Sequence, residues 1–148
     1  MSQPGAQVEL SASPGYLLKV AASALRSAME DVLRPLGMTV THYSCLELLA
    51  QRPGLSSSEL ARGAFVTRQS MNVLLQALQR DGLVIRPEQP VAGRTLPTEL
   101  TAAGRRQVAV ASAAVRAVED RMVGDLGPPD RERLVALLRG CVDALHQA

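Results

Sequence analysis

The sequence predicts a mainly α-helical protein with one small β-hairpin. Three observations lead to this fold class. Hydrophobic residues make up 47% of the 148-residue chain but aromatic residues only 2%, so the core must be built from Leu, Val and Ala, and Leu and Ala are strong helix formers. Apolar residues recur at spacings of three and four along most of the chain. One short β-branched run, residues 83–86, precedes a loop with two prolines and a glycine, which favours a hairpin.

Length and charge favour a single domain, residues 1–148, with a basic segment. A chain of 148 residues can bury a core of its own. The net charge is only +2, but residues 62–106 hold seven arginines and three acidic residues, so this segment carries +4 and the remainder −2. A positive segment in a near-neutral chain suits a surface that binds an anionic partner such as double-stranded DNA.

The chain shows no targeting signal that we recognise. The N-terminus lacks a basic region followed by an apolar run, and no stretch approaches the ~18 apolar residues of a membrane helix. We therefore expect a cytoplasmic protein without a membrane partner. Cys45 and Cys141 are far apart within helical patterns, so no disulfide framework is predicted.

The first predicted helix begins at Ser13-Pro14, a hydroxyl that can cap and a proline that suits the first helical position. Residues 1–12 show no period and are expected to form a loose tail. The helix reaches about residue 33 and ends before Pro35 and Gly37. Its apolar stripe comprises Leu17, Val20 or Ala21, Ala24, Ala28 and Val32.

Three further helices are predicted between residues 39 and 80. Thr39 or Thr41 caps a helix to about residue 51. Ser56 and Glu59 form a capping box that opens a short helix to about residue 62. After a turn at 63–66, Thr67 caps a helix to about residue 80. The expected buried positions are Cys45, Leu46 and Leu49 on the first of these helices and Met71, Leu74, Leu75 and Leu78 on the last.

The C-terminal half continues with the hairpin and two helices. The first strand covers 83–86 and the returning strand 95–100, where Pro97 makes it an edge strand or breaks it. Thr101 caps a long helix to about residue 123, residues 124–129 break it, and Asp130 opens a last helix to about residue 146. Apolar residues at helical spacing are Val108, Ala111 or Ser112, Val115, Val118 and Met122, and then Leu134, Leu137 or Leu138, Cys141 and Leu145.

The helix that follows Thr67 has the composition of a helix that reads DNA. Its polar face carries Gln69, Asn72, Val73 and Gln76, opposite the apolar stripe. In the major groove Gln and Asn can bond adenine and Val can touch a thymine methyl group. Taken alone, this pattern would indicate an ordinary amphipathic helix whose polar face meets only water. The helix-turn-helix spacing and the hairpin that follows favour a helix that reads DNA.

Other side chains are suited to the DNA backbone and the minor groove. Arg68 can reach guanine or phosphate, and Arg94 at the end of the hairpin loop can enter the minor groove. The helix N-termini at Ser56 and Thr67 favour phosphate. Further candidate phosphate contacts are Arg62, Arg80 and Arg86.

Five stretches together resemble the multiple antibiotic resistance regulator (MarR) family of bacterial transcription factors. Their order and spacing match, and the flanking helices fit the family's six-helix plan over nearly the whole chain. They are Ser58-Glu59-Leu60-Ala61, Val66-Thr67-Arg68-Gln69-Ser70, Asp81-Gly82-Leu83-Val84, Gly93-Arg94 and Leu100-Thr101-Ala102-Ala103-Gly104. Three features depart from the family pattern. Ala92 replaces the aspartate of the family's Asp-x-Arg, and Phe65 stands in the turn where a small or left-handed-tolerant residue is usual. Asn72 and Val73 stand where a basic residue often follows the first turns of the reading helix.

The resemblance implies a winged helix-turn-helix at residues 38–101, with dimerisation helices at 13–36 and 102–148. It also implies an obligate homodimer that binds a palindromic operator, usually as a repressor that a small ligand or an oxidant releases. An effector, expected to be small and aromatic or lipophilic, would lie between the dimer helices and the DNA-reading region. By this resemblance the candidate ligand residues are Tyr16, His42, Tyr43, Cys45 and Leu46, for which core packing is the alternative.

Two other functions stay open at this point. Cys45 could sense peroxide, with Cys141 as its partner across the dimer, because His42 lies three residues earlier on the same face; a buried, inert thiol is the alternative. A winged-helix dimer could also bind protein instead of DNA. No Gly-rich phosphate loop, metal-ligand spacing or nucleophile motif is present, so we expect neither an enzyme nor a cofactor.

Overall fold

A computed structural model of the chain describes residues 7–86 and 97–147. Its helices are α1 (Pro14–Leu33), α2 (Val40–Gln51), α3 (Ser57–Ala64), α4 (Arg68–Arg80), α5 (Ala102–Met122) and α6 (Pro128–His146), with 3₁₀ turns at Leu10–Ala12 and Arg34–Leu36. Strands β1 (Val84–Ile85) and β2 (Glu99–Leu100) form the antiparallel hairpin. The predicted fold class, mainly α with a small hairpin, is confirmed.

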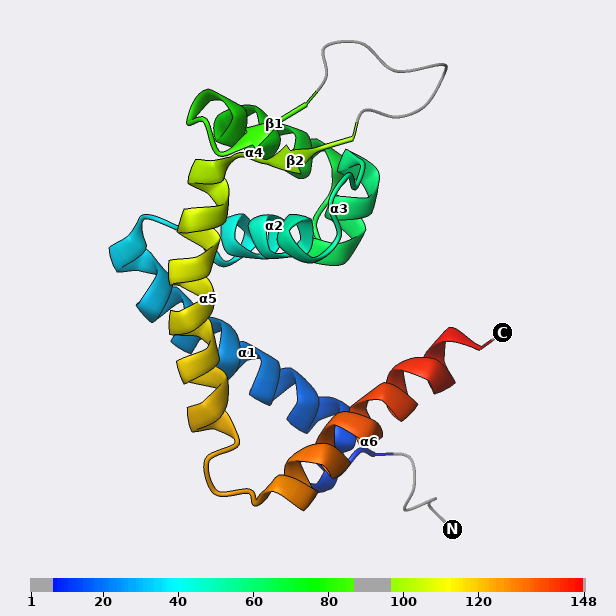
Figure 1. The fold of residues 1–148 in the computed structure, drawn as a ribbon. Helices are drawn as coiled ribbons and strands as arrows, with labels where there is room; N and C mark the ends of the chain where they lie inside the picture. The colour runs from blue at the N-terminus through cyan, green and yellow to red at the C-terminus, as the bar shows by residue number, and fades with distance from the viewer. Residues whose placement is uncertain (1–6, 87–96, 148) are drawn as a thin grey trace.

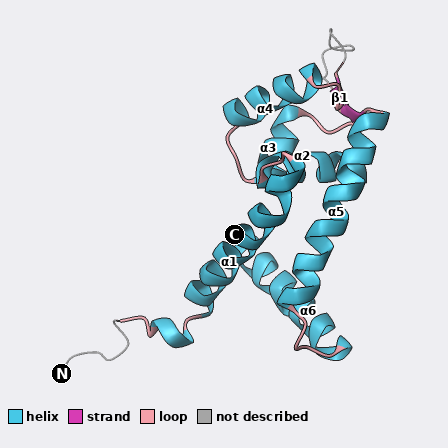
Figure 2. Cartoon of the chain, turned by 90° about the vertical axis from the view of Figure 1, so that its left-hand side faces the viewer, coloured by secondary structure: helices cyan, strands magenta, loops and turns pink. Residues whose placement is uncertain are grey.

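The molecule has two parts, a head and three arm helices, α1, α5 and α6 (Figure 1). The head consists of α2, α3, α4 and the hairpin. Helix α5 runs out of the head, α1 crosses it and packs against it, and α6 turns back from its far end (Figures 1 and 2). No helix in the part of the chain that the structure describes is both long and apolar enough to cross a membrane.

Five of the predicted helix starts are capped as the sequence indicates, including the capping box of Ser56 and Glu59 at α3. The side chain of Ser13 accepts from the Tyr16 amide, and Thr39, rather than Thr41, caps α2. Thr67 and Thr101 accept from the third amide of α4 and α5 in the same way. Because each cap involves residues only three apart, the boundaries follow from local sequence alone.

Several boundaries differ from the prediction. Strand β1 covers only Val84–Ile85 of the predicted 83–86, and α3 extends to Ala64, into the predicted turn. Helix α6 begins at Pro128, with Gly127 as its N-cap, and not at Asp130, because proline is well accommodated in the first helical turn. The returning strand is shorter than predicted, and its first two predicted residues lie outside the described residues. Thr98 pairs instead with the α2–α3 connection: its amide donates to the Leu55 carbonyl, and its carbonyl accepts from the Gly54 amide.

The core lies in the head and where α1 and α5 join it, and apart from Tyr43 it contains no aromatic side chain among the described residues. Its fully buried side chains include Leu33 from the end of α1, Leu46 and Leu49 from α2, and Leu60 from α3. Helix α4 contributes Met71, Leu75 and Leu78, while Leu74 is only half-buried, which corrects the prediction that it belongs to the buried stripe.

Helices α1 and α6 bury little of their own apolar surface within one chain. Leu33 is the one buried residue among those of α1, and no residue of α6 in the described chain is buried. Leu17 on α1 is 48% exposed, and Leu137 and Leu145 on α6 are 61% and 86% exposed. Several large apolar side chains exposed on the same two helices are typical of an interaction surface.

Candidate nucleic-acid interface and ligand cavity

Helix α4 presents the predicted polar face to solvent. Gln69, Asn72, Val73 and Gln76 are all exposed, and Val73, an apolar residue, is 63% exposed. The opposite face is anchored in the core through Met71, Leu75 and Leu78. The helix is therefore held rigidly on one side while its other side can enter a groove.

The turn before α4 is tightly bonded. At the C-terminus of α3 the amide of Phe65 donates to the Arg62 carbonyl, and the amide of Val66 donates to the Ala61 carbonyl. This is the pattern of a Schellman motif, in which glycine usually occupies the left-handed position. Here Phe65 occupies it, with φ = 60°, the one non-glycine residue with positive φ in the described chain. Thr67 then caps α4 through the Ser70 amide at 3.0 Å.

Most of the predicted phosphate-binding arginines lie on the surface of the head. Arg62, Arg68 and Arg80 are exposed, and Arg86 is half-buried just after β1. Arg94, the predicted minor-groove contact, lies outside the described residues. Arg68 and Arg80 are the first and last residues of α4, and Arg62 lies in the last turn of α3, so the basic side chains flank the predicted reading face, where DNA phosphates would need neutralising.

Ser56, one of the predicted phosphate contacts, is largely shielded from solvent. It is only 6% exposed. Its hydroxyl accepts from the Glu59 amide at 3.2 Å, and its own amide donates to the Glu59 carboxylate at 3.0 Å. These hydrogen bonds also lower the pKa of Glu59. Both groups of Ser56 are therefore engaged in the capping box of α3. A phosphate contact at this helix start stays a prediction.

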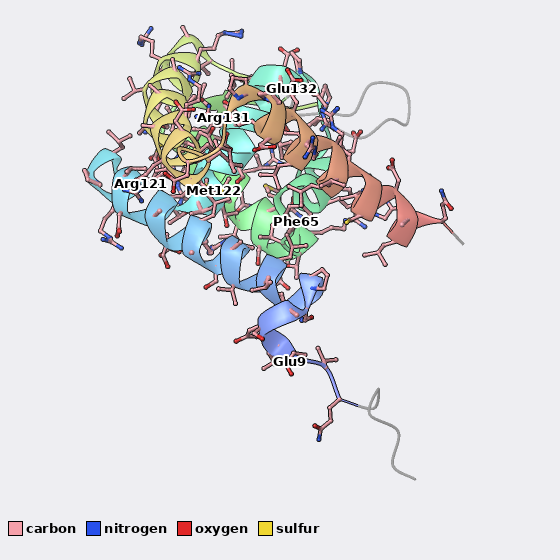
Figure 3. The ribbon with its side chains drawn as sticks, turned by 90° about the horizontal axis from the view of Figure 1, so that it is seen from below. Glu9, Phe65, Arg121, Met122, Arg131 and Glu132 are labelled. Atoms are coloured by element: carbon pink, nitrogen blue, oxygen red, sulfur yellow. The ribbon has the colours of Figure 1, made fainter. Side chains whose placement is uncertain are left out.

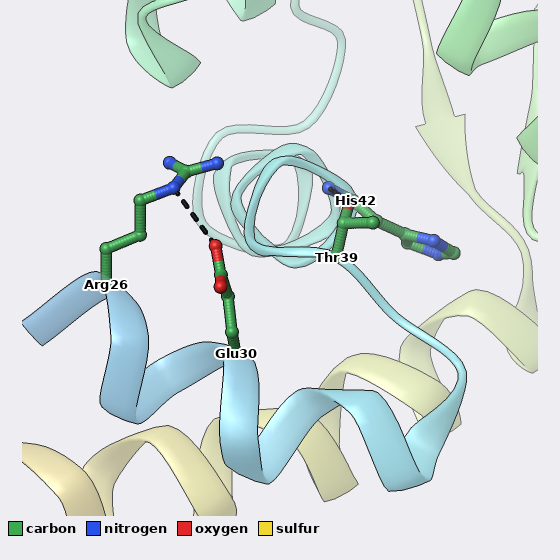
Figure 4. Close-up of polar contacts among 4 residues, drawn as sticks. All are labelled: Arg26, Glu30, Thr39 and His42. Carbon is green, nitrogen blue, oxygen red and sulfur yellow. Dashed lines mark hydrogen bonds and ion pairs between the residues drawn. The ribbon is translucent and has the colours of Figure 1, made fainter.

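A cavity of about 400 Å³ lies where α1, α2 and the α3–α4 turn meet. Its wall is largely apolar, with one basic residue, Arg26. Arg26 forms an ion pair with Glu30 on the same helix, with 3.3 Å between Nε and Oε1 (Figure 4). The lining residues are Ala22, Leu25, Arg26 and Met29 of α1, Val40, Thr41 and Ser44 of α2, and Ala64, Phe65 and Val66 of the turn.

None of the five predicted ligand residues lines this cavity. Cys45 and Leu46 are fully buried in the core, and Tyr16 lies exposed on α1. Tyr43 borders a separate cavity of about 220 Å³, together with Glu47 and other α2 residues. Positions 22, 25, 26 and 29 of the larger cavity share one face of α1, and helical spacing predicts this shared face. Spacing alone does not show which other element packs opposite that face and encloses the cavity.

His42 points away from the cavity. Figure 4 shows its ring on the opposite side of α2 from Arg26 and Glu30. Burial lowers the pKa of His42, and a side-chain interaction with Gln107 on α5 and the charge of Asp81 partly oppose this. His42 is therefore part of the α2–α5 packing and holds no position from which it could bind a ligand in the cavity.

The environment of Cys45 is the reverse of what a redox sensor needs. Its side chain is 0% exposed, and burial raises its pKa to about 12. A reactive thiol requires a lowered pKa and access to the oxidant. The structure therefore argues against peroxide sensing through Cys45; Cys141 is exposed on α6.

Comparisons with known proteins agree with this geometry. A family model described as "MarR family" matches residues 36–95, which cover α2 to the hairpin loop. The HTH-type transcriptional repressor Rv2887 of Mycobacterium tuberculosis is 44% identical over 84% of this chain and 89% of its own length. The chain belongs to the MarR family. As a MarR-family winged helix-turn-helix protein it is a DNA-binding regulator of transcription and not an enzyme.

Solved structures of MarR-family proteins share the fold. The crystal structure of Rv2887 in complex with salicylic acid has a TM-score of 0.73 at 42% identity, covering 88% of this chain and 96% of that one. The same protein in complex with DNA has a TM-score of 0.74 at 40% identity, covering 88% and 98%. A MarR-family regulator from Silicibacter pomeroyi has a TM-score of 0.86 at 25% identity, covering 99% of both chains.

Proposed function

We propose that this MarR-family chain is a homodimeric repressor that binds a palindromic operator and is released by a small aromatic acid. The observation that carries the proposal is α4, whose exposed face of Gln69, Asn72, Val73 and Gln76 stands on a buried apolar stripe. In this proposal these residues and Arg68 read the major groove, and Arg94 reaches the minor groove.

The homodimer is supported by the apolar faces of α1 and α6. Residues 13–36 and 102–148 would form the dimerisation region, and residues 38–101 the DNA-binding region. The exposed leucines of α1 and α6 would be buried by a second copy of the chain. A dimer with a two-fold axis places two copies of α4 in successive major grooves, so its operator is palindromic.

The effector is supported by the cavity and by a relative. Rv2887 has been crystallised with salicylic acid, a small aromatic carboxylic acid. The cavity of about 400 Å³ between α1, α2 and the α3–α4 turn falls within the usual size of small-molecule sites. Apolar side chains would contact the ring of such an acid, and Arg26 would attract its carboxylate.

Selection of genomic DNA fragments by the purified protein tests the proposal. We expect the selected fragments to share an inverted repeat whose half-sites are separated by about one helical turn. Binding to this repeat should weaken steeply with salt, because phosphate neutralisation releases counterions. Failure to bind any DNA at low salt would overturn the proposal and favour a protein-binding winged-helix dimer.

A further inference from the structure

Phe65 combines two features that each oppose stability. It is 93% exposed although it is the one phenylalanine of the chain, and it holds the left-handed conformation, which a side chain with a Cβ atom adopts only against steric resistance. Residues that keep such a conformation cluster at ligand-binding and switch positions. Neither feature contributes to the core, so a functional reason is indicated.

The position of Phe65 suggests what that reason is. It contributes to the wall of the cavity between α1, α2 and the α3–α4 turn. Because its ring is almost fully exposed, Phe65 stands at the rim of that cavity and not in its floor. Seen from below, it lies on the face of the head that is turned toward α1 (Figure 3).

The same residue is directly connected to the reading helix. Phe65 precedes Thr67, the cap of α4, by two residues, and the intervening Val66 is bonded through its amide to Ala61. Only Val66 and the cap residue Thr67 separate Phe65 from the first turn of α4, so a shift of the Phe65 backbone has a short covalent route to that turn. That first turn carries Arg68 and Gln69 of the proposed DNA-reading face.

We propose that the Phe65 ring closes over an aromatic carboxylic acid bound in this cavity and thereby moves α4 out of its DNA-binding position. This rests on the proposed function, and it assigns the coupling between effector and DNA to one residue. Arg26 supplies the charge for the carboxylate, because its ion pair with Glu30 engages one edge of a guanidinium group that has five donors. The aromatic ring of Phe65 supplies a stacking surface for the ligand ring.

The test uses two ring-less variants and salicylate as the probe. Phe65→Ala keeps a Cβ atom in the left-handed conformation, and Phe65→Asn is a residue that tolerates it. Calorimetry measures salicylate binding, and anisotropy of a labelled operator fragment measures DNA binding. We expect both variants to bind ligand-free DNA like the wild type, and to bind salicylate about tenfold more weakly. They should also need a correspondingly higher salicylate concentration to release DNA.

Three controls separate the ring from other effects. Phe65→Tyr should restore salicylate binding and release, because it restores the ring. Val110→Ala removes an exposed apolar side chain outside the cavity and should behave like the wild type. Salicylamide lacks the carboxylate charge and should bind weakly to every variant.

Two results would overturn the inference in distinguishable ways. If the wild type responds to salicylate and both ring-less variants respond equally, the role of Phe65 is wrong while the proposed effector stands. If the wild type neither binds salicylate nor releases DNA with it, the effector part of the proposed function is wrong, and the coupling through Phe65 falls with it.

Discussion

The hydroxyl of Ser112 on α5 donates a 2.8 Å hydrogen bond to the carboxylate of Glu47 on α2. Ser112 is only 8% exposed, and Glu47 also accepts from Gln51 through its other oxygen, at 3.0 Å. The bond joins residues 65 positions apart. It connects helix α5 to α2 of the head, at the junction between the two parts of the molecule.

Removing this hydrogen bond should loosen the junction. We expect Ser112→Ala to lower the free energy of unfolding by about 1–3 kcal/mol, because a partly buried carboxylate loses a donor. Urea unfolding followed by circular dichroism measures the change. In a Glu47→Gln background the same substitution should cost clearly less. Equal costs in both backgrounds would show that the loss arises elsewhere.

The reading helix makes a prediction about base preference. Gln69→Ala should relax the preference at one base pair of each half-site, by about 1–3 kcal/mol, while other positions keep theirs. Arg80→Ala should instead weaken binding to all sequences about equally and reduce the salt dependence. Titration of a set of single-base operator variants measures both effects. A uniform loss for Gln69→Ala would make it a phosphate contact.

The apolar face of α6 makes a prediction about assembly. Leu138→Glu should place a charge in the proposed interface and weaken dimerisation by about 2 kcal/mol or more, shifting the protein toward monomer. Light scattering coupled to gel filtration measures the mass. Ala136→Glu, on the opposite face of the same helix, is the matched control and should leave the dimer intact. A wild type that is itself monomeric would contradict the proposed dimer.

His42 makes a prediction about pH. Burial lowers its pKa below the ordinary value of 6.5, so the folded state favours the neutral ring and the unfolded state binds more protons. The neutral His42 ring therefore contributes to the free energy of unfolding in full above about pH 6.5. This contribution is lost as the pH falls through the lowered pKa of the folded state. Urea unfolding between about pH 7.5 and pH 5 should show this loss.

The matched variants are His42→Gln and His146→Gln. The first should reduce the loss of stability on acidification, whereas the second removes the exposed histidine at the end of α6 and should leave it unchanged. If His42→Gln and the wild type lose stability in parallel, other groups are responsible for the pH dependence.

Cys45 makes a prediction about oxidation. Because its thiol is fully buried and burial raises its pKa to about 12, peroxide should not oxidise it in the folded protein. Operator binding of the wild type and of Cys45→Ala should respond identically to peroxide. A wild-type release of DNA that Cys45→Ala abolishes would restore the redox interpretation.

The sequence by itself determined the helices and the face of α4. Caps such as Ser13, Thr67 and Thr101, and apolar spacing such as Met71, Leu75 and Leu78, act between residues three or four positions apart. These interactions are complete within one helical turn, so they can be read without knowing the fold. The exposed Gln69 and Asn72 follow from the same periodicity.

Only the tertiary structure decided the cavity, the state of Cys45 and the length of β2. The cavity requires α1, α2 and the α3–α4 turn to meet, the inertness of Cys45 requires neighbours that exclude water, and Thr98 pairs with Leu55 across 43 positions (98 minus 55). Local spacing cannot specify such contacts, because it shows which side of a helix is apolar but not what packs against it. The Phe65 conformation belongs to the same class, since surrounding contacts hold a backbone angle that its own side chain disfavours.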